Sequence, residues 1–73
     1  MSSILVDIRI YMVVRGGIDY LMYRTLTAAV SASHPGDDIE EWVALDGAAR
    51  LLPVRVWNVG RGGELLVREA TQR

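Results

Sequence analysis

His34 is the one histidine in this 73-residue chain, and it stands next to Pro35. A single histidine cannot hold zinc without other strong ligands, and the chain has no cysteine. General-base catalysis would also need a nucleophile close by, and no motif supplies one. We therefore expect His34 to be an ordinary loop residue and the chain not to be an enzyme.

Two other clusters could in principle bind a metal or a cofactor. Acidic side chains gather at Asp37, Asp38, Glu40 and Glu41. They lack the alternating ligands and the central glycine of a calcium loop, so helix capping and solvation explain them better. The glycines at positions 60, 62 and 63 fail the dinucleotide fingerprint, because a leucine at position 65 replaces the third glycine. We expect neither a metal nor a cofactor.

The sequence Arg-Gly-Gly occurs twice, at residues 15–17 and 61–63, and each copy ends a longer similarity. Residues 9–17 read RIYMVVRGG and residues 55–63 read RVWNVGRGG. Arg-Gly-Gly tracts with aromatic residues can bind single-stranded RNA. Two isolated copies fit hairpin turns better, and Arg15 and Arg61 would then present guanidinium groups to a phosphate or a carboxylate.

The first hairpin is predicted from alternating residues over 4–14, followed by a loop at 15–17 and a second strand. A three-residue loop would pair Val14 with Ile18 and Tyr11 with Leu21. The segment 18–30 also carries a helical stripe that includes Leu26, so a helix is the alternative. We favour the strand because of the tyrosine and threonine content.

A short helix is predicted over residues 38–46, after the turn-forming cluster at 33–38. Asp37 would cap it, an acidic first turn would suit its positive end, and Gly47 would close it. The alternative is a strand that ends in a turn at Asp46 and Gly47.

The second hairpin is predicted to pair Val59 with Leu65, Trp57 with Val67 and Arg55 with Glu69. The whole chain, 1–73, is then a single α+β domain of order ββαββ, with one short helix on an antiparallel sheet. Two alternatives remain: a βαβββ order with a helix over 18–31, and a small all-β barrel.

Charge and hydropathy exclude several classes of protein. All eight basic residues are arginines, nine residues are acidic, and the net charge is -1. Such a balance does not favour strong binding to duplex DNA alone. No apolar stretch approaches the roughly 18 residues of a membrane-spanning helix, and the first residues lack the basic region of a signal peptide. We expect a cytoplasmic protein.

The first strand is apolar on both faces. We expect the face with Ile8, Ile10, Met12 and Val14 to form the core. The other face would meet a protein partner, and its contact residues are predicted as a set: Tyr11, Val13, Leu21 and Tyr23, with Arg9 and Arg15 at the rim and Arg61 at the other turn. The alternative is that the second hairpin packs on this face as a second layer.

In length, lack of catalytic groups, lysine-free arginine set and compact α/β pattern, the chain resembles the small transcription regulators that lytic bacteriophages make against host RNA polymerase. The resemblance implies a protein that binds polymerase subunits directly in the host bacterial cytoplasm and acts on initiation or termination. It assigns no residue a role. Two other functions remain open: a nucleic-acid-binding module that uses the arginine turns, and a structural subunit that self-associates through edge strands.

Overall fold

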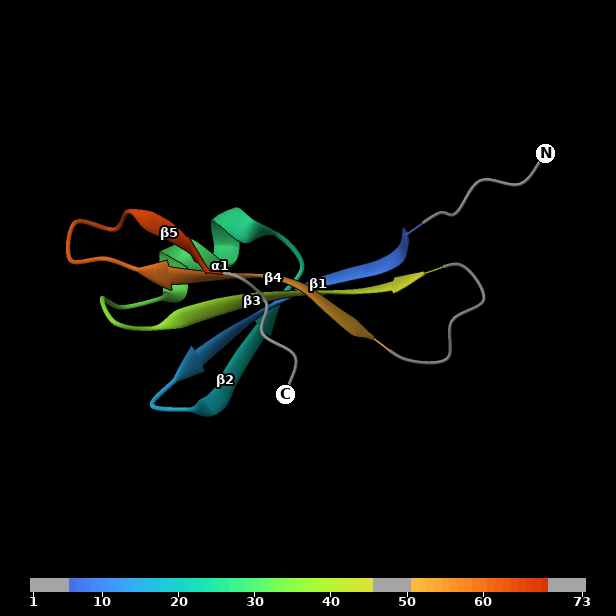
Figure 1. The fold of residues 1–73 in the computed structure, drawn as a ribbon, viewed down its shortest axis with the longest axis horizontal. Helices are drawn as coiled ribbons and strands as arrows, with labels where there is room; N and C mark the ends of the chain where they lie inside the picture. Colours follow the sequence, from blue (N-terminus) through green and yellow to red (C-terminus); the bar gives the residue numbers. More distant parts are fainter. Residues whose placement is uncertain (1–5, 46–50, 69–73) are drawn as a thin grey trace.

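The computed structural model describes residues 6–45 and 51–68 and shows a small single domain, an open antiparallel sheet with one short helix (Figure 1). The elements in chain order are β1 (Val6–Arg15), β2 (Ile18–Tyr23), α1 (Leu26–Ala32), β3 (Asp38–Leu45), β4 (Leu52–Val59) and β5 (Leu65–Arg68). The five strands follow the spatial order β2-β1-β3-β4-β5. The α+β class is thus confirmed, but the order is ββαβββ rather than ββαββ or βαβββ, and the sheet is open rather than a barrel.

The first hairpin forms as predicted, but its register is shifted. Only Gly16 and Gly17 form the loop, with φ of 61° and 79°. A two-residue turn with both φ values positive matches the twist of the flanking strands, and glycine adopts it without steric cost. Arg15 therefore stays in β1 and pairs with Ile18, and after a bulge Tyr11 pairs with Tyr23 rather than with Leu21.

The segment 18–30 divides between the two structures considered for it. Its first part is β2 and its last part belongs to α1. Thr25 caps the helix, because its Oγ1 accepts a hydrogen bond from the Ala28 N–H at 3.1 Å. Leu26, Ala29 and Val30 then lie in or against the hydrophobic core. The strand prediction was therefore wrong beyond Tyr23, and the helix alternative was wrong before Leu26.

The helix predicted over residues 38–46 is wrong, because Asp38–Leu45 is strand β3 at the centre of the sheet. β3 hydrogen-bonds to β1 on one side and to β4 on the other, which a short helix could not match. Its side chains alternate, with Ile39 and Val43 buried on one face. The alternative turn at residues 46–47 lies outside the described residues.

The second hairpin has the predicted register. Val59 pairs with Leu65 and Trp57 with Val67. The turn between β4 and β5 is longer than that of the first hairpin and closes with a hydrogen bond from the Gly60 N–H to the Glu64 carbonyl at 2.8 Å. The expected pairing of Arg55 with Glu69 lies outside the described residues.

The core lies between the sheet and α1, on the face opposite to the one expected. We call the side of the sheet that faces α1 the helix face. The buried residues of the core cluster are Val13, Ala29, Ile39, Trp57 and Val59. The predicted core face carries Ile8, which is 49% exposed, although Val14 on that face is buried. No helix within the described ranges is long and apolar enough to cross a membrane.

Candidate protein-binding surface

The predicted contact residues of β1 lie on the helix face, under or beside α1. Val13 is fully buried in the core, so its expected place at an exposed surface is wrong. Tyr11 and Tyr23 are half-buried and pack against the same core. Leu21, the cross-strand partner of Val13, stays exposed. The structure thus brings these four residues together, but only Leu21 among them is mainly exposed to solvent.

Arg9 and Tyr11 both contact Glu41, a buried carboxylate on the adjacent strand β3. The Arg9 Nη1 donates to Glu41 Oε2, and the Tyr11 hydroxyl donates to the same oxygen at 3.1 Å. Burial, with the hydrogen bond to Glu41 next, raises the pKa of Tyr11 above its ordinary 10.0. A buried carboxylate needs such partners, so this cluster serves the fold first.

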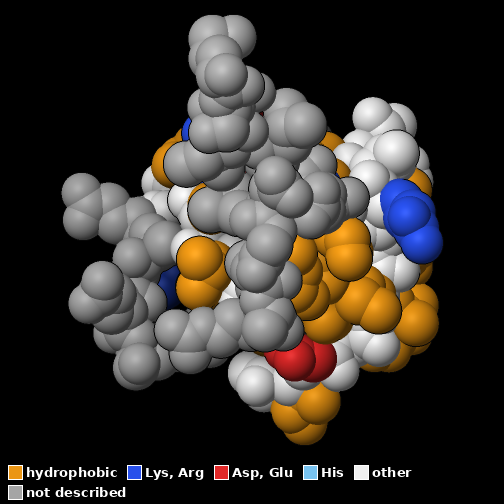
Figure 2. Space-filling view, turned by 90° about the vertical axis from the view of Figure 1, so that its right-hand side faces the viewer, with side chains coloured by type: hydrophobic (Ala, Val, Ile, Leu, Met, Phe, Trp, Pro, Cys, Tyr) orange, Lys and Arg blue, Asp and Glu red, His pale blue; other side chains and the backbone are white. Residues whose placement is uncertain are grey.

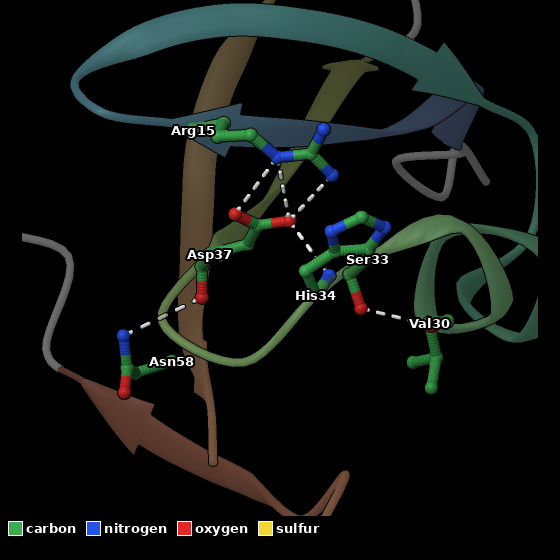
Figure 3. A network of polar contacts seen from close by, with 6 residues as sticks. All are labelled: Arg15, Val30, Ser33, His34, Asp37 and Asn58. Carbon is green, nitrogen blue, oxygen red and sulfur yellow. Dashed lines mark hydrogen bonds and ion pairs between the residues drawn. The ribbon is translucent and has the colours of Figure 1, made fainter. Parts of the chain in front are cut away.

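Arg15 is also held by a buried carboxylate (Figure 3). Its Nε donates to both oxygens of Asp37 and its Nη2 donates to Oδ2 at 2.9 Å. The backbone N–H of His34 donates to the same Oδ2 at 2.8 Å. The Arg15 guanidinium holds the pKa of Asp37 below its ordinary 3.8. Asp37 is therefore an anchor for the first hairpin rather than a helix cap.

The Asp37 anchor extends to the other half of the sheet. The N–H of Val59 donates to the Asp37 carbonyl at 2.9 Å, and the Gly36 N–H donates to the Val59 carbonyl at 2.8 Å. Asn58 donates to Asp38 Oδ1 at 2.9 Å. The segment after α1 thus joins both hairpins, and His34 takes part through its backbone while its side chain is exposed.

Arg61, the remaining predicted contact, lies apart from the others in the turn between β4 and β5. β3 separates the hairpin that carries this turn from the first hairpin in the sheet. Within the described residues Arg61 is exposed and makes no ion pair. It therefore differs from Arg15, although the two residues hold equivalent positions in the repeated sequence.

The opposite face of the sheet carries a shallow, mainly apolar groove of about 240 Å³. Its lining comes from the first hairpin, from β3 and from the residue before β4: Ile10, Met12, Asp19, Met22, Trp42 and Leu51. We call this the groove face. The Trp42 indole N–H donates to Glu40 Oε1 at 3.1 Å, which holds the aromatic ring at the groove. Asp19 is the one acidic residue in this lining.

Exposed apolar side chains continue from this groove along β1 and β2, and those of β2 lie on both faces of the sheet. Figure 2 shows hydrophobic side chains in a broad area beside the residues drawn in grey, with few charged atoms among them. The large exposed residues of the first hairpin form one set: Ile8, Ile18, Tyr20, Leu21 and Met22. An extensive exposed apolar surface is typical of a place where another molecule binds.

Sequence reasoning missed the groove because it assigned Ile10 and Met12 to the core. The signal that could have found it is the pairing of buried acids with arginines. Glu41 lies on the same face of β3 as Ile39 and Val43. Arg9 lies on the same face of β1 as Tyr11 and Val13. Assigning both sets of residues to one buried face would have placed Ile10 and Met12 of β1 on the opposite, more exposed face of the sheet.

In the described part of the chain no group of three histidine, aspartate or glutamate side chains is placed to hold a metal ion. Comparison with protein-family models, with curated proteins and with solved structures finds no match for this chain.

Proposed function

We propose that this chain is a non-enzymatic regulator that works by binding another protein through the groove face. The observation that carries the proposal is the apolar groove together with the exposed side chains of Ile8 and Met22 on the same face of the sheet. The groove is shallow and the exposed apolar surface next to it is broad. Such a surface suits a protein partner better than a small molecule, which usually binds in a more enclosed pocket. Met12, Met22 and Trp42 supply the adaptable and aromatic contacts that are common in protein interfaces.

The arginines support protein binding over nucleic-acid binding. Arg9, Arg15 and Arg68 each form an ion pair with a carboxylate of β3 or of the residue before it, and Arg55 lies over the ring of Trp57 at 5.6 Å. These guanidinium groups serve the fold and offer little unpaired charge for phosphates. Among the described arginines, Arg24 and Arg61 form neither an ion pair nor a contact with an aromatic ring, and two such groups are a small electrostatic footprint.

The first partner to test is bacterial RNA polymerase, which the overall character of the chain favours. Immobilised protein is titrated with purified core polymerase and with separate polymerase subunits. We expect saturable binding that Met12→Ala weakens by about tenfold, since buried side chains at interfaces often carry more than 1 kcal/mol. Leu66→Ala is the matched control, because Leu66 is exposed on the same face but lies on β5.

Circular dichroism of each variant shows whether the fold is kept. Equal loss of binding by Met12→Ala and Leu66→Ala would contradict the groove as the binding site. Retention on nucleic acid that disappears after nuclease treatment, with no polymerase binding, would favour the nucleic-acid-binding alternative instead.

A further inference from the structure

The outer edge of β2 is unpaired among the described residues. β2 is the first strand in the spatial order of the sheet, and in Figure 1 no other described element lies beyond it. Five of its six residues are exposed, and Asp19 is its only charged residue. Edge strands are usually protected by lysine, proline or several charges. β2 has none of these, although the bulge near the turn distorts its first half.

The exposed apolar side chains of β2 lie on both faces of the sheet. Leu21 pairs with Val13 on the helix face, whereas Met22 pairs with Met12 on the groove face. A partner that docks on one face would cover only one of these rows. A further strand alongside the edge would cover both rows and would also use the free main-chain groups.

The register of the first hairpin indicates which main-chain groups are free. In a two-residue hairpin the closing pair, here Arg15 with Ile18, is hydrogen-bonded, and antiparallel pairs alternate from there. Counting back along β1 makes Val13–Leu21 a bonded pair and Met12–Met22 a non-bonded pair. The N–H and C=O of Met22 therefore point away from β1, towards the open edge.

The strand that fits this edge is a second copy of β2. Antiparallel pairing about a two-fold axis at Met22 would set Leu21 opposite Tyr23 of the second copy, so apolar residues meet apolar residues on each face. Two copies with a net charge of -1 each repel one another weakly. The other edge strand, β5, is less suitable because it has four residues and ends at Arg68, which is paired with Asp38.

We propose that this chain forms a two-fold dimer by antiparallel pairing of β2 with β2 of a second copy, centred on Met22. The two sheets become continuous, and both grooves lie on one side of the joint sheet. This inference concerns the chain by itself, and it stands or falls separately from the binding of polymerase.

The test is sedimentation equilibrium of the purified full chain over a concentration series of about 1 µM to 1 mM. We expect a reversible equilibrium between monomer and dimer. Met22→Pro removes the outward N–H that pairing needs but is tolerated at the outer side of an edge strand, so the dimer should be lost while the fold remains.

A second pair of variants keeps the test decisive if the proline variant does not fold. Leu21→Lys puts a charge on the edge and should raise the dimer dissociation constant at least about tenfold. Val67→Lys is the matched control, since Val67 is 69% exposed on the other edge strand, and it should leave the constant unchanged. A monomer throughout the series, a larger oligomer, or an equal effect of the two lysines would overturn the proposal.

Discussion

Two segments of this chain have similar sequences, identical at five of nine positions, but differ in the contacts that hold their turns. Residues 9–17 and 55–63 both form a strand followed by a glycine turn, and both flank β3. Equivalent positions converge on one core: Val13 and Val59 are buried together, and the rings of Tyr11 and Trp57 lie 6.3 Å apart. The turns differ, because Arg15 is tied to Asp37 whereas Arg61 is exposed and unpaired among the described residues.

This difference indicates that the local sequence determines the strand and the turn, whereas residues distant in sequence determine whether the arginine of the turn is held in an ion pair or exposed. Asp37 is 22 positions from Arg15 and holds it at the first turn, and the β2 strand of that hairpin exposes apolar side chains. No buried carboxylate of the described residues reaches Arg61. The first hairpin is therefore the better candidate for a defined binding surface.

Substitutions in the core that the two segments share should have the largest effect on the free energy of unfolding. Trp57→Ala removes a buried ring from the common core and should cost about 3–5 kcal/mol in the free energy of unfolding. Tyr11→Ala should cost less, because Tyr11 is only half-buried. Urea unfolding followed by circular dichroism measures both, and equal losses would break the expected ranking.

Loss of the Asp37 carboxylate, which binds the arginine of the first turn, should have the next largest effect on stability. Asp37→Ala removes the buried acceptor of Arg15 and of the His34 N–H, and should cost about 1–3 kcal/mol. The matched change at the unanchored turn, Arg61→Ala, should stay within about 0.5 kcal/mol, as for most exposed sites. Urea unfolding measures both changes in the free energy of unfolding. A large loss of stability on Arg61→Ala would show that Arg61 makes a stabilising interaction and would contradict the contrast between the two turns.

The two turns also differ in backbone conformation at an equivalent glycine. Gly16 has a φ of 61°, whereas Gly62 is not among the glycines of positive φ. Gly16→Ala should cost about 1–2 kcal/mol through backbone strain, since a Cβ there meets no atom within 4 Å. Gly62→Ala should cost less in the same unfolding assay, and a reversed order would show that the turn geometries are assigned wrongly.

Acidification should weaken the anchored hairpin first. The pKa of Asp37 is lowered in the folded protein, chiefly by the hydrogen bond to Arg15, so its contribution to stability is present above the ordinary value of 3.8. That contribution is lost as the pH falls through the lowered pKa. The urea concentration at the midpoint of unfolding should therefore decrease when the pH is brought below about 4, and Asp37→Asn should lessen this decrease. An identical drop in the variant would assign the effect to other carboxylates.

The sequence predicted those parts of the fold that local pattern determines. The first strand, β2 and the register of the second hairpin follow from alternation and from the glycines. The strand at Asp38–Leu45 could not be separated from a helix locally, because two adjacent glutamates and an acidic start are typical of a helix. It is a strand because β1 and β4 pair with its two edges.

The covered face could not be predicted from β1 alone, because both of its faces are apolar. α1 selects the Tyr11 and Val13 face, and Arg9 gives Glu41 a partner there. The predicted contact set therefore contained one fully buried residue, Val13, and omitted Met22, which lines the groove, whereas the predicted Leu21 is exposed on the helix face. Binding by these residues stays a prediction.

The exchange rate of the Met22 amide proton tests the claim that the β2 edge of the first hairpin pairs with a second copy of this chain. Exchange is measured by residue-resolved NMR on the purified protein at low and at high concentration. We expect Met22 exchange to slow as the concentration rises, while exchange at Val67 on β5, whose N–H points away from β4 by the same alternation of pairs, stays constant. Unchanged exchange at Met22 would contradict this expectation, and slowing at Val67 instead would move the association surface to the other edge of the sheet.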